Sequence, residues 1–422
     1  MKKNRNYRNL WMAQVGSQFG NWFNQVALAQ ITLTLTHSPS AMGLVLFSGS
    51  LPAVALGPFV GPFVDRLPKK PILFITDLLR AVFALGFSLA IVFHASWVLY
   101  VDAFLLGLAG ILFSPARSSA IPLVVPREDL TAANTLESSA NGLLQIFGAA
   151  LGGIVAVTLS PLACFAINAA SYLWSALCIM RTTWEVRHEV VKRTPYFESL
   201  REGFQEAIHN RYARSIILIG ISWGLAGGGY YVLIPILGQQ TFHMGGLGIG
   251  ILYAIDGVGV LLGSYFVTKF VGINHRRAVI WYGIAYLTQA VFFGLMTQFT
   301  VFIIGSIMLL FMRISSGVII PLDTYMVQTS VEANKQGRVF ALHGSTYVGV
   351  MQLSFAITGF ALQDFGIRSI GLVIGVISLF CGVSWLAQFG RKSVISPVSI
   401  NFRVCPNQSA SFMMGVQRVE SP

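Results

Sequence analysis

The sequence predicts an all-α membrane protein, with twelve transmembrane helices in two pseudo-symmetric six-helix bundles. Three observations lead to this prediction. The 422 residues are 55% hydrophobic and only 10% charged, which is too apolar for a soluble globular protein. Apolar stretches long enough to span a bilayer recur along the chain and are separated by polar gaps. The Lys and Arg residues gather in every second gap, as expected of a chain that crosses a membrane repeatedly.

The predicted spans form two sets of six, separated by a polar, mixed-charge stretch. The first set covers residues 10–36, 41–64, 71–94, 97–116, 132–158 and 161–180. The second set covers residues 215–238, 246–270, 278–298, 300–326, 338–363 and 367–389. We therefore divide the chain into a first bundle over residues 1–180, a cytoplasmic linker over 181–212, a second bundle over 213–390 and a polar, disordered cytoplasmic tail over 391–422.

The two sets of spans also repeat one another. A constant shift of 206 residues places Pro115 on Pro321 and Gly153 on Gly359. Each coincidence is weak alone. Together with two sets of six spans and a central linker, they predict parallel halves related by an axis along the membrane normal.

The distribution of basic residues predicts the orientation of the chain. All but three of the 28 Lys and Arg residues fall on one side of the predicted spans. Arg80 and Arg313 lie inside spans, and only Arg368 remains for the other side. Because cytoplasmic loops retain basic residues, we expect both termini in the cytoplasm and the protein in the cell membrane. The net charge of +12 then reflects topology, so we expect no nucleic-acid partner.

Motifs for catalysis, metals and disulfides are missing from the sequence. Its four Cys residues have neither disulfide nor metal-ligand spacing, and the chain has no Walker A loop and no His-Glu-x-x-His motif. The segment from Gly220 to Gly224 matches the nucleophile-elbow pattern, but no strand precedes it. We therefore predict that the chain is not an enzyme and needs no metal or other cofactor.

A decapeptide between the second and third spans, GPFVDRLPKK at residues 61–70, resembles the loop motif of the major facilitator superfamily. Three further segments narrow the resemblance to the branch with macrolide-efflux proteins and the enterobactin exporter: DLLRA at 77–81, SPAR at 114–117 and GRVF at 337–340. The resemblance covers about residues 8 to 390. It implies a secondary transporter that alternates access by rocking one half against the other, with the first helix of each half at its centre.

Amide side chains line one face of the first span. They stand at i, i+4, i+7 and i+11, and they are Gln14, Gln18, Asn21 and Gln25. Amides that face lipid would lack partners, so this face points inward. We interpret it as the wall of a substrate cavity, because the resemblance places this helix at the centre. The alternative is hydrogen bonding that holds the bundle together.

Aromatic residues flank three consecutive glycines in the seventh span. Trp223 and Tyr230 stand on either side of Gly227 to Gly229. The glycines would permit a bend, and the rings suit flat, lipophilic and cationic compounds. We count both aromatic residues as cavity candidates, and anchoring at the membrane interface is the alternative.

Acidic residues inside spans are the candidates for proton coupling. Asp256 lies midway along its span with no basic residue within two turns, and an unpaired carboxylate at that depth is costly unless it is protonated or partnered across helices. A neutral acid that donates a structural hydrogen bond is the alternative. Glu137 and Asp323 lie nearer the cytoplasmic ends, as carriers or gate residues.

The basic residues inside spans leave further alternatives open. Arg313 is a cavity candidate, as a ligand or proton-site partner, or else a structural charge for an acid that the sequence does not identify. For Asp323 a separate alternative stays open: the shift of 206 residues places it on Arg117, so the two could pair across the halves. Asp102, near the outer end of the fourth span, is expected to be solvated.

A cytoplasmic charge network is the last candidate. Asp77 and Arg80 share a helix face, so a local ion pair is expected. The resemblance implies that they belong to a network that holds one access state closed, and positive-inside topology alone is the alternative. The candidates for this gate are Gly61, Asp65, Arg66, Lys69, Lys70, Asp77, Arg80 and Arg117.

These interpretations lead to one functional hypothesis. We expect a transporter that exports small amphipathic compounds, such as a macrolide-like drug or a siderophore, with the proton gradient as its energy source. Its partners would be the lipid bilayer and the substrate, and a single chain would suffice. The alternatives are an importer or permease on the same fold and, with less support, a membrane-embedded enzyme.

Overall fold

The structure is a computed structural model that describes residues 4–183, 196–272 and 274–390. The predicted tail 391–422 and part of the predicted linker therefore lie outside the described residues. The described backbone is almost entirely helical and contains no strand. This confirms the all-α fold class.

The first half contains six long helices. They are α1 (Arg5–Thr36), α2 (Pro39–Asp65), α3 (Lys69–Val92), α4 (Trp97–Val124), α5 (Leu130–Thr158) and α6 (Pro161–Met180). Local sequence explains two of the starts. Ser38 and Ser160 accept a hydrogen bond from the backbone N–H three residues later, and a Pro follows each of them, which is the preferred arrangement at a helix N-terminus.

The second half begins after a short linker helix and has five continuous helical stretches. They are α8 (Arg211–Ile236), α9 (Gly245–Phe266), α10 (His275–Met296), α11 (Phe302–Ser330) and α12 (Ala333–Trp385). Helix α12 is interrupted at Gly366, where φ is 70°, a left-handed value that glycine adopts at little cost. The break divides α12 into two spans, so the described residues hold twelve membrane-spanning segments.

Hydropathy alone identifies fewer crossings than the helices provide. Ten stretches are long and apolar enough to cross a membrane, and one of them is the interrupted α12 counted as a single stretch. Helix α1 is absent from these ten because the amides of its inward face lower its hydropathy. The first span is identified by the length of α1 and by its place at the start of the six-helix half, and not by its hydropathy.

Two features of the fold differ from the sequence prediction. The predicted linker contains an amphipathic helix, α7 (Tyr196–His209), which ion pairs hold against α12: Glu202 with Arg338 and Glu206 with Lys335. Helix α4 continues to Val124 instead of ending near residue 116, because its internal prolines do not terminate it.

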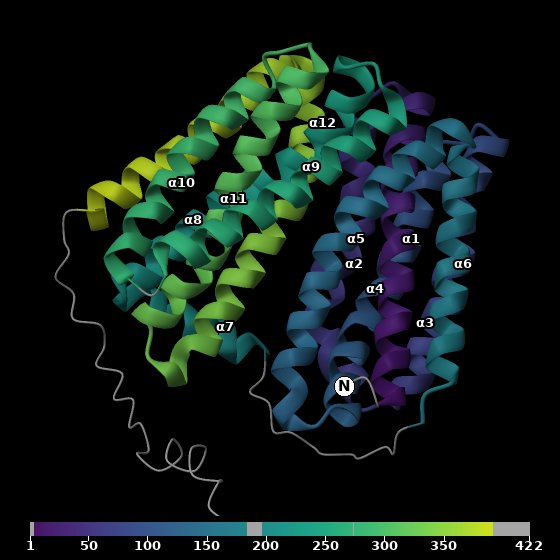
Figure 1. Cartoon of the computed structure of the whole chain (residues 1–422), viewed down its shortest axis with the longest axis horizontal. Coiled ribbons are helices and arrows are strands. Elements are labelled where there is room, and N and C mark those ends of the chain that lie inside the picture. The colour runs from purple at the N-terminus through teal and green to yellow at the C-terminus, as the bar shows by residue number, and fades with distance from the viewer. Residues whose placement is uncertain (1–3, 184–195, 273, 391–422) are drawn as a thin grey trace, which may run out of the picture.

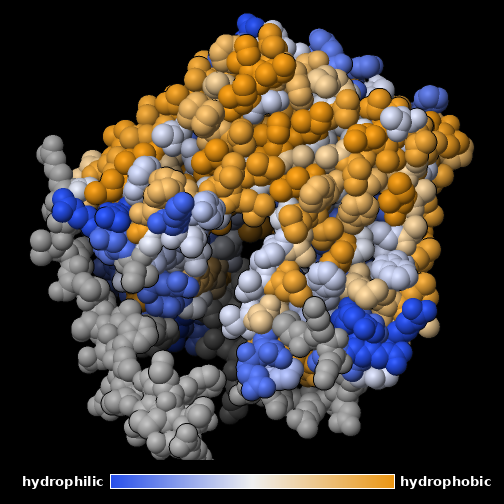
Figure 2. Space-filling model, in the orientation of Figure 1, coloured by the Kyte–Doolittle hydropathy of each residue, from blue (hydrophilic) through white to orange (hydrophobic). Residues whose placement is uncertain are grey.

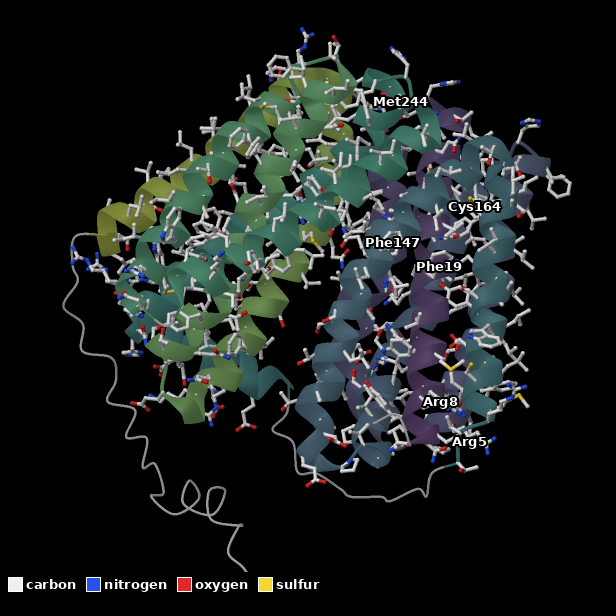
Figure 3. The ribbon with its side chains drawn as sticks, in the orientation of Figure 1. Arg5, Arg8, Phe19, Phe147, Cys164 and Met244 are labelled. Carbon is white, nitrogen blue, oxygen red and sulfur yellow. The ribbon has the colours of Figure 1, made fainter. Side chains whose placement is uncertain are left out.

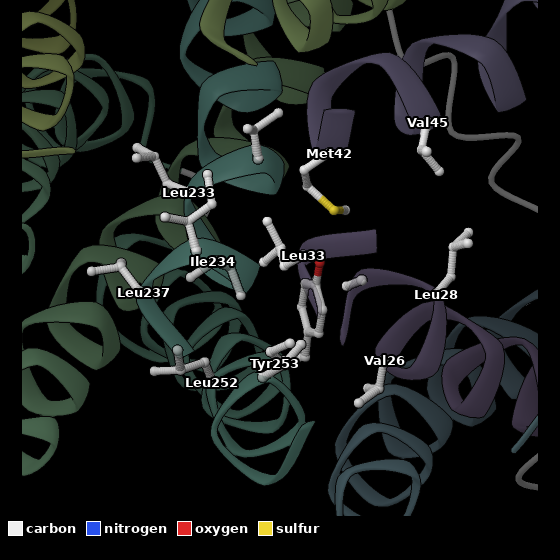
Figure 4. Packing of buried hydrophobic residues seen from close by; sticks show 14 of the residues in the cluster. Val26, Leu28, Leu33, Met42, Val45, Leu233, Ile234, Leu237, Leu252 and Tyr253 are labelled. Carbon is white, nitrogen blue, oxygen red and sulfur yellow. The ribbon is translucent and has the colours of Figure 1, made fainter. Parts of the chain in front are cut away.

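The two halves join at one end and part at the other (Figure 1). The joined end is the one away from the N-terminus, and there α2 packs on α12 and α5 packs on α9. Figure 4 shows this junction from close by: Leu33 of α1 and Met42 of α2 face Ile234 of α8 and Tyr253 of α9. One buried cluster therefore crosses from half to half.

Glycines allow the helices of the two halves to approach closely. A Cβ added to Gly359 of α12 would lie 3.0 Å from the Cα of Gly43 in α2. A Cβ added to Gly43 would lie 2.3 Å from the Phe355 carbonyl oxygen of α12. In the other contact, a Cβ on Gly153 of α5 would lie 3.1 Å from the Cα of Gly250 in α9. Small residues at such crossings permit the backbone contact that stabilises helices in lipid.

The surface has the pattern of a protein surrounded by lipid, with a cleft between the halves (Figure 2). Hydrophobic residues form a broad band over both halves, and hydrophilic residues gather at the end that carries the N-terminus. The surface is hollowed between the halves and opens toward this end. Figure 3 shows Arg5 and Arg8 at the open end and Met244 at the joined end.

The junction predicts a specific sensitivity to size. Gly43→Ala places a Cβ against the α12 backbone, so we expect a loss of about 1–3 kcal/mol of unfolding free energy. Gly349→Ala, on α12 itself, is the matched control because nothing lies within 4 Å of its added Cβ. Denaturant unfolding of both variants in detergent micelles tests this, and equal stability of the two variants would contradict it.

Candidate functional site

The amide face of α1 runs from the interior of the first half to the junction. Gln14, Gln18, Asn21 and Gln25 are all partly buried. The Asn21 amide donates to Gln18 Oε1 at 3.2 Å, and the Tyr172 hydroxyl of α6 donates to Asn21. Gln25 lies beside the Tyr253 hydroxyl of α9 in the other half. Asn21 thus makes an interhelical contact, while Gln25 reaches toward the second half.

A buried ion pair lies directly behind this face. Arg80 Nη1 is 3.2 Å from Asp77 Oδ1, and Asp77 is completely buried. The Arg80 guanidinium lies over the ring of Tyr172 at 4.2 Å and over that of Phe113 at 4.7 Å. The expected local ion pair is therefore present, and Tyr172 connects it to Asn21.

A second buried ion pair occupies the second half. Arg313 of α11 donates from Nε to Asp256 of α9, and its guanidinium lies 4.7 Å from the centre of the Tyr230 ring of α8. Asp256 is therefore not unpaired: its partner comes from a neighbouring helix, out of reach of a search within two turns. Removal of either side chain would leave the other as an unpaired buried charge.

The aromatic candidates of α8 lie inside the protein rather than at the membrane interface. Tyr230 is 2% exposed, and Trp223 contacts the rings of Tyr286 and Tyr347 at 6.5 and 5.7 Å. The glycines between them do not bend α8. Instead they allow α12 to approach, since a Cβ on Gly228 would lie 2.5 Å from the Met351 carbonyl oxygen.

Asp323 has two partners in the second half. It accepts from the Tyr282 hydroxyl of α10 at 2.7 Å and lies 2.8 Å from His343 Nε2 of α12. The open alternative of a pairing with Arg117 is wrong in this structure, because Arg117 pairs with Glu137 of α5 inside the first half. His343 is absent from the predicted site residues, although a polar ring inside the predicted span 338–363 is a signal that could have identified it.

The remaining gate candidates take separate roles at helix ends. Lys69 Nζ donates to the Val64 carbonyl at the end of α2, and Lys70 Nζ donates to the Met180 and Thr182 carbonyls at the end of α6. Arg66 is exposed. The surroundings of Gly61 and of the Asp65 side chain lie outside the described part of the chain, so the network involving Asp65 remains a prediction.

Asp102 differs from its expected environment. It is only 8% exposed, and its carboxylate packs on Gly86 of α3, where a Cβ would lie 2.4 Å from Oδ2. The position near the end of a span did not indicate this burial, because the packing of α3 on α4 covers it. Among the described residues, no cluster of three His, Cys, Asp or Glu side chains could hold a metal ion.

Comparisons with known proteins bear on the whole arrangement. The sequence model of the Major Facilitator Superfamily matches residues 10–355. BacE of Bacillus subtilis (strain 168), a candidate bacilysin exporter, is 28% identical over 345 residues, which are 81% of this chain and 84% of BacE. Macrolide efflux protein A of Streptococcus pyogenes is 24% identical over 392 residues, 89% of this chain and 95% of that protein.

A solved structure shares the fold. The crystal structure of the nucleoside transporter NupG has a TM-score of 0.71 at 14% sequence identity, covering 92% of this chain and 100% of NupG. At this identity the likeness shows the fold alone. It agrees with two halves of six spans around a cleft.

The Asp77–Arg80 pair predicts non-additive stability. Either Asp77→Asn or Arg80→Gln leaves one buried charge without a partner, which we expect to lower the unfolding free energy by about 3–5 kcal/mol. The double variant removes both charges and should lose much less than the sum of the two. A double-mutant cycle in detergent micelles measures this coupling. Additive losses would contradict the pairing.

Proposed function

The chain belongs to the Major Facilitator Superfamily, and on this premise we propose that it exports small amphipathic compounds across the cell membrane in exchange for protons. Transport would proceed by alternating access, with the cleft between the halves as the pathway. Both the family and the relatives named as transporters indicate that the chain is a transporter and not an enzyme.

Orientation follows from charge. The end that carries Arg5 and Arg8 also carries α7 (Figure 1). The sequence places most basic residues in gaps on the side of the spans that holds the N-terminus, which supports a cytoplasmic position for this end by the positive-inside rule. The cleft opens at this end. The structure would then represent the state that loads a compound from the cytoplasm or from the inner leaflet of the cell membrane.

The observation that best supports this proposal is the buried Asp256–Arg313 pair, in which the Arg313 guanidinium lies over the Tyr230 ring. A cation, a carboxylate and aromatic rings from α8, α9 and α11 meet there, and Gln25 of α1 lies nearby beside Tyr253. Such a site combines apolar contact with a few fixed polar groups, which is how pockets for small amphipathic molecules are built. Arg313, whose side chain keeps 14% exposure, would contact the polar group of the compound, and the buried Asp256 would hold Arg313 in place.

The energetics support proton exchange. Moving one charge across a membrane potential of 100 mV is worth about 2.3 kcal/mol, which is enough to bias two conformations that differ by a few kcal/mol. Export rather than import is supported by the names of BacE and of macrolide efflux protein A. Both walls of the cleft come from one chain, so we propose that a monomer is the functional unit in the bilayer, without a nucleic-acid partner.

Everted membrane vesicles test the proposal. Erythromycin and ethidium serve as probes, and vesicles with the wild-type protein should accumulate one of them when a proton gradient is imposed. Arg313→Gln leaves Asp256 as an unpaired buried carboxylate, so we expect its initial uptake rate to fall at least about tenfold, which corresponds to roughly 1.4 kcal/mol.

Arg368→Gln is the matched control, because Arg368 is exposed at the joined end. It should transport like the wild type. Uptake that survives collapse of the proton gradient would contradict proton exchange, and accumulation of the probe by intact cells would contradict export.

A further inference from the structure

One titratable cluster in the second half is separate from the Asp256–Arg313 pair. Asp323 Oδ2 lies 2.8 Å from His343 Nε2, and the Tyr282 hydroxyl donates to Asp323 Oδ1 at 2.7 Å. The two side chains retain 10% and 12% exposure, so the pair is largely withdrawn from solvent. Three helices, α10, α11 and α12, each contribute one member.

The groups that face the Asp323–His343 pair come from α8, α10 and α12. The titratable groups that face it are Tyr282 and Tyr286 from α10 and Tyr347 from α12, with Cys381 behind Tyr286. Helix α8 presents Gly220, where a Cβ would lie 2.7 Å from His343 Nδ1. Among the described residues, no Lys or Arg forms an ion pair with either Asp323 or His343.

The hydrogen bonds indicate which atom would titrate. The Tyr282 hydroxyl donates to one oxygen of Asp323, and His343 Nε2 lies within hydrogen-bonding distance of the other, so an ionised carboxylate could accept from both with the imidazole N–H at Nε2. His343 Nδ1 is buried without a hydrogen-bond partner among the described residues. A proton taken up at Nδ1 would make the ring an imidazolium and change the net charge of the pair from −1 to 0.

We propose that Asp323 and His343 form the proton-binding site of this transporter, an assignment that rests on the proposed function. Imidazole is the side chain that gains and loses a proton most readily in the physiological pH range. The protonated pair carries no net charge, so it tolerates burial better than the deprotonated pair when the cytoplasmic side closes. The small part of each side chain that stays exposed when this side is open is where the proton would leave. Asp256 does not take this role, because Arg313 already neutralises it.

Tyr347 connects the proton site to the cavity. It lies one helical turn beyond His343 on the same face of α12, and both Asp323 and Arg313 act electrostatically on it. Its ring also contacts Trp223 of α8 at 5.7 Å. A change of charge at His343 therefore acts next to the groups that would hold the transported compound, which is the physical requirement for coupling.

Vesicle transport with two assays tests this assignment. An imposed gradient of about one pH unit should drive roughly tenfold accumulation of erythromycin or ethidium in one-for-one exchange with protons. His343→Gln keeps a donor for Asp323 but cannot titrate, so it should lose gradient-driven accumulation while exchange of labelled probe across the membrane continues. Asp323→Asn should behave likewise. His209→Gln, on the exposed face of α7, is the matched control and should retain both activities.

A ligand-free measurement separates this assignment from the export proposal. Infrared difference spectra of the reconstituted protein, recorded between acidic and alkaline buffer, should lose an imidazole band together with the Asp323 carboxylate bands in His343→Gln, whereas His209→Gln should lose an imidazole band alone. Loss of those bands in a protein that moves neither probe would refute export and support the proton site. Unchanged bands, or wild-type accumulation by His343→Gln, would overturn the proton site and leave export intact.

Discussion

Close helix contact at one end of the molecule is the constraint on which the rest of the structure depends. Glycines in α2, α5, α9 and α12 remove the side chains that would hold the two halves apart, and the backbones touch at Gly43 and at Gly153. Apolar residues from both halves then bury one another around Leu33 and Tyr253. Because the close backbone contacts between the described parts of the halves gather at this end, the halves can part at the other end, and that separation creates the cleft.

The charges inside the bundles follow one chemical rule in both halves. Each half holds an Arg whose guanidinium pairs with an Asp and lies over a Tyr ring: Arg80 on Tyr172 and Arg313 on Tyr230. A buried guanidinium is costly unless its charge is paired, and the ring adds attraction on the open face. The first pair lies behind the amide face of α1, whereas the second lies where α8, α9 and α11 meet.

The contacts around α12 bring the proposed proton site and the proposed substrate site into one half. α12 carries His343 and Tyr347 one turn apart, and it packs closely on α8 because the glycines of α8 have no side chains to exclude it. Rocking of the halves would leave these contacts within the second half intact. Protonation and binding would therefore influence one another through a rigid bundle, and the conformational change would occur at the interface between the bundles.

Sequence by itself determined the number of spans and, apart from the end of α4, their limits to within about five residues, because lipid imposes length, hydropathy and charge sidedness on every crossing. Its motifs also indicated the family. It also identified Asp77 and Arg80 as neighbours, since three residues separate them on one helix. Only the tertiary structure decided which charges meet across helices: Asp256 with Arg313, Asp323 with His343, and Glu137 with Arg117. These partners are distant in sequence, and their distances depend on the rotation and packing of whole helices, which no local pattern encodes.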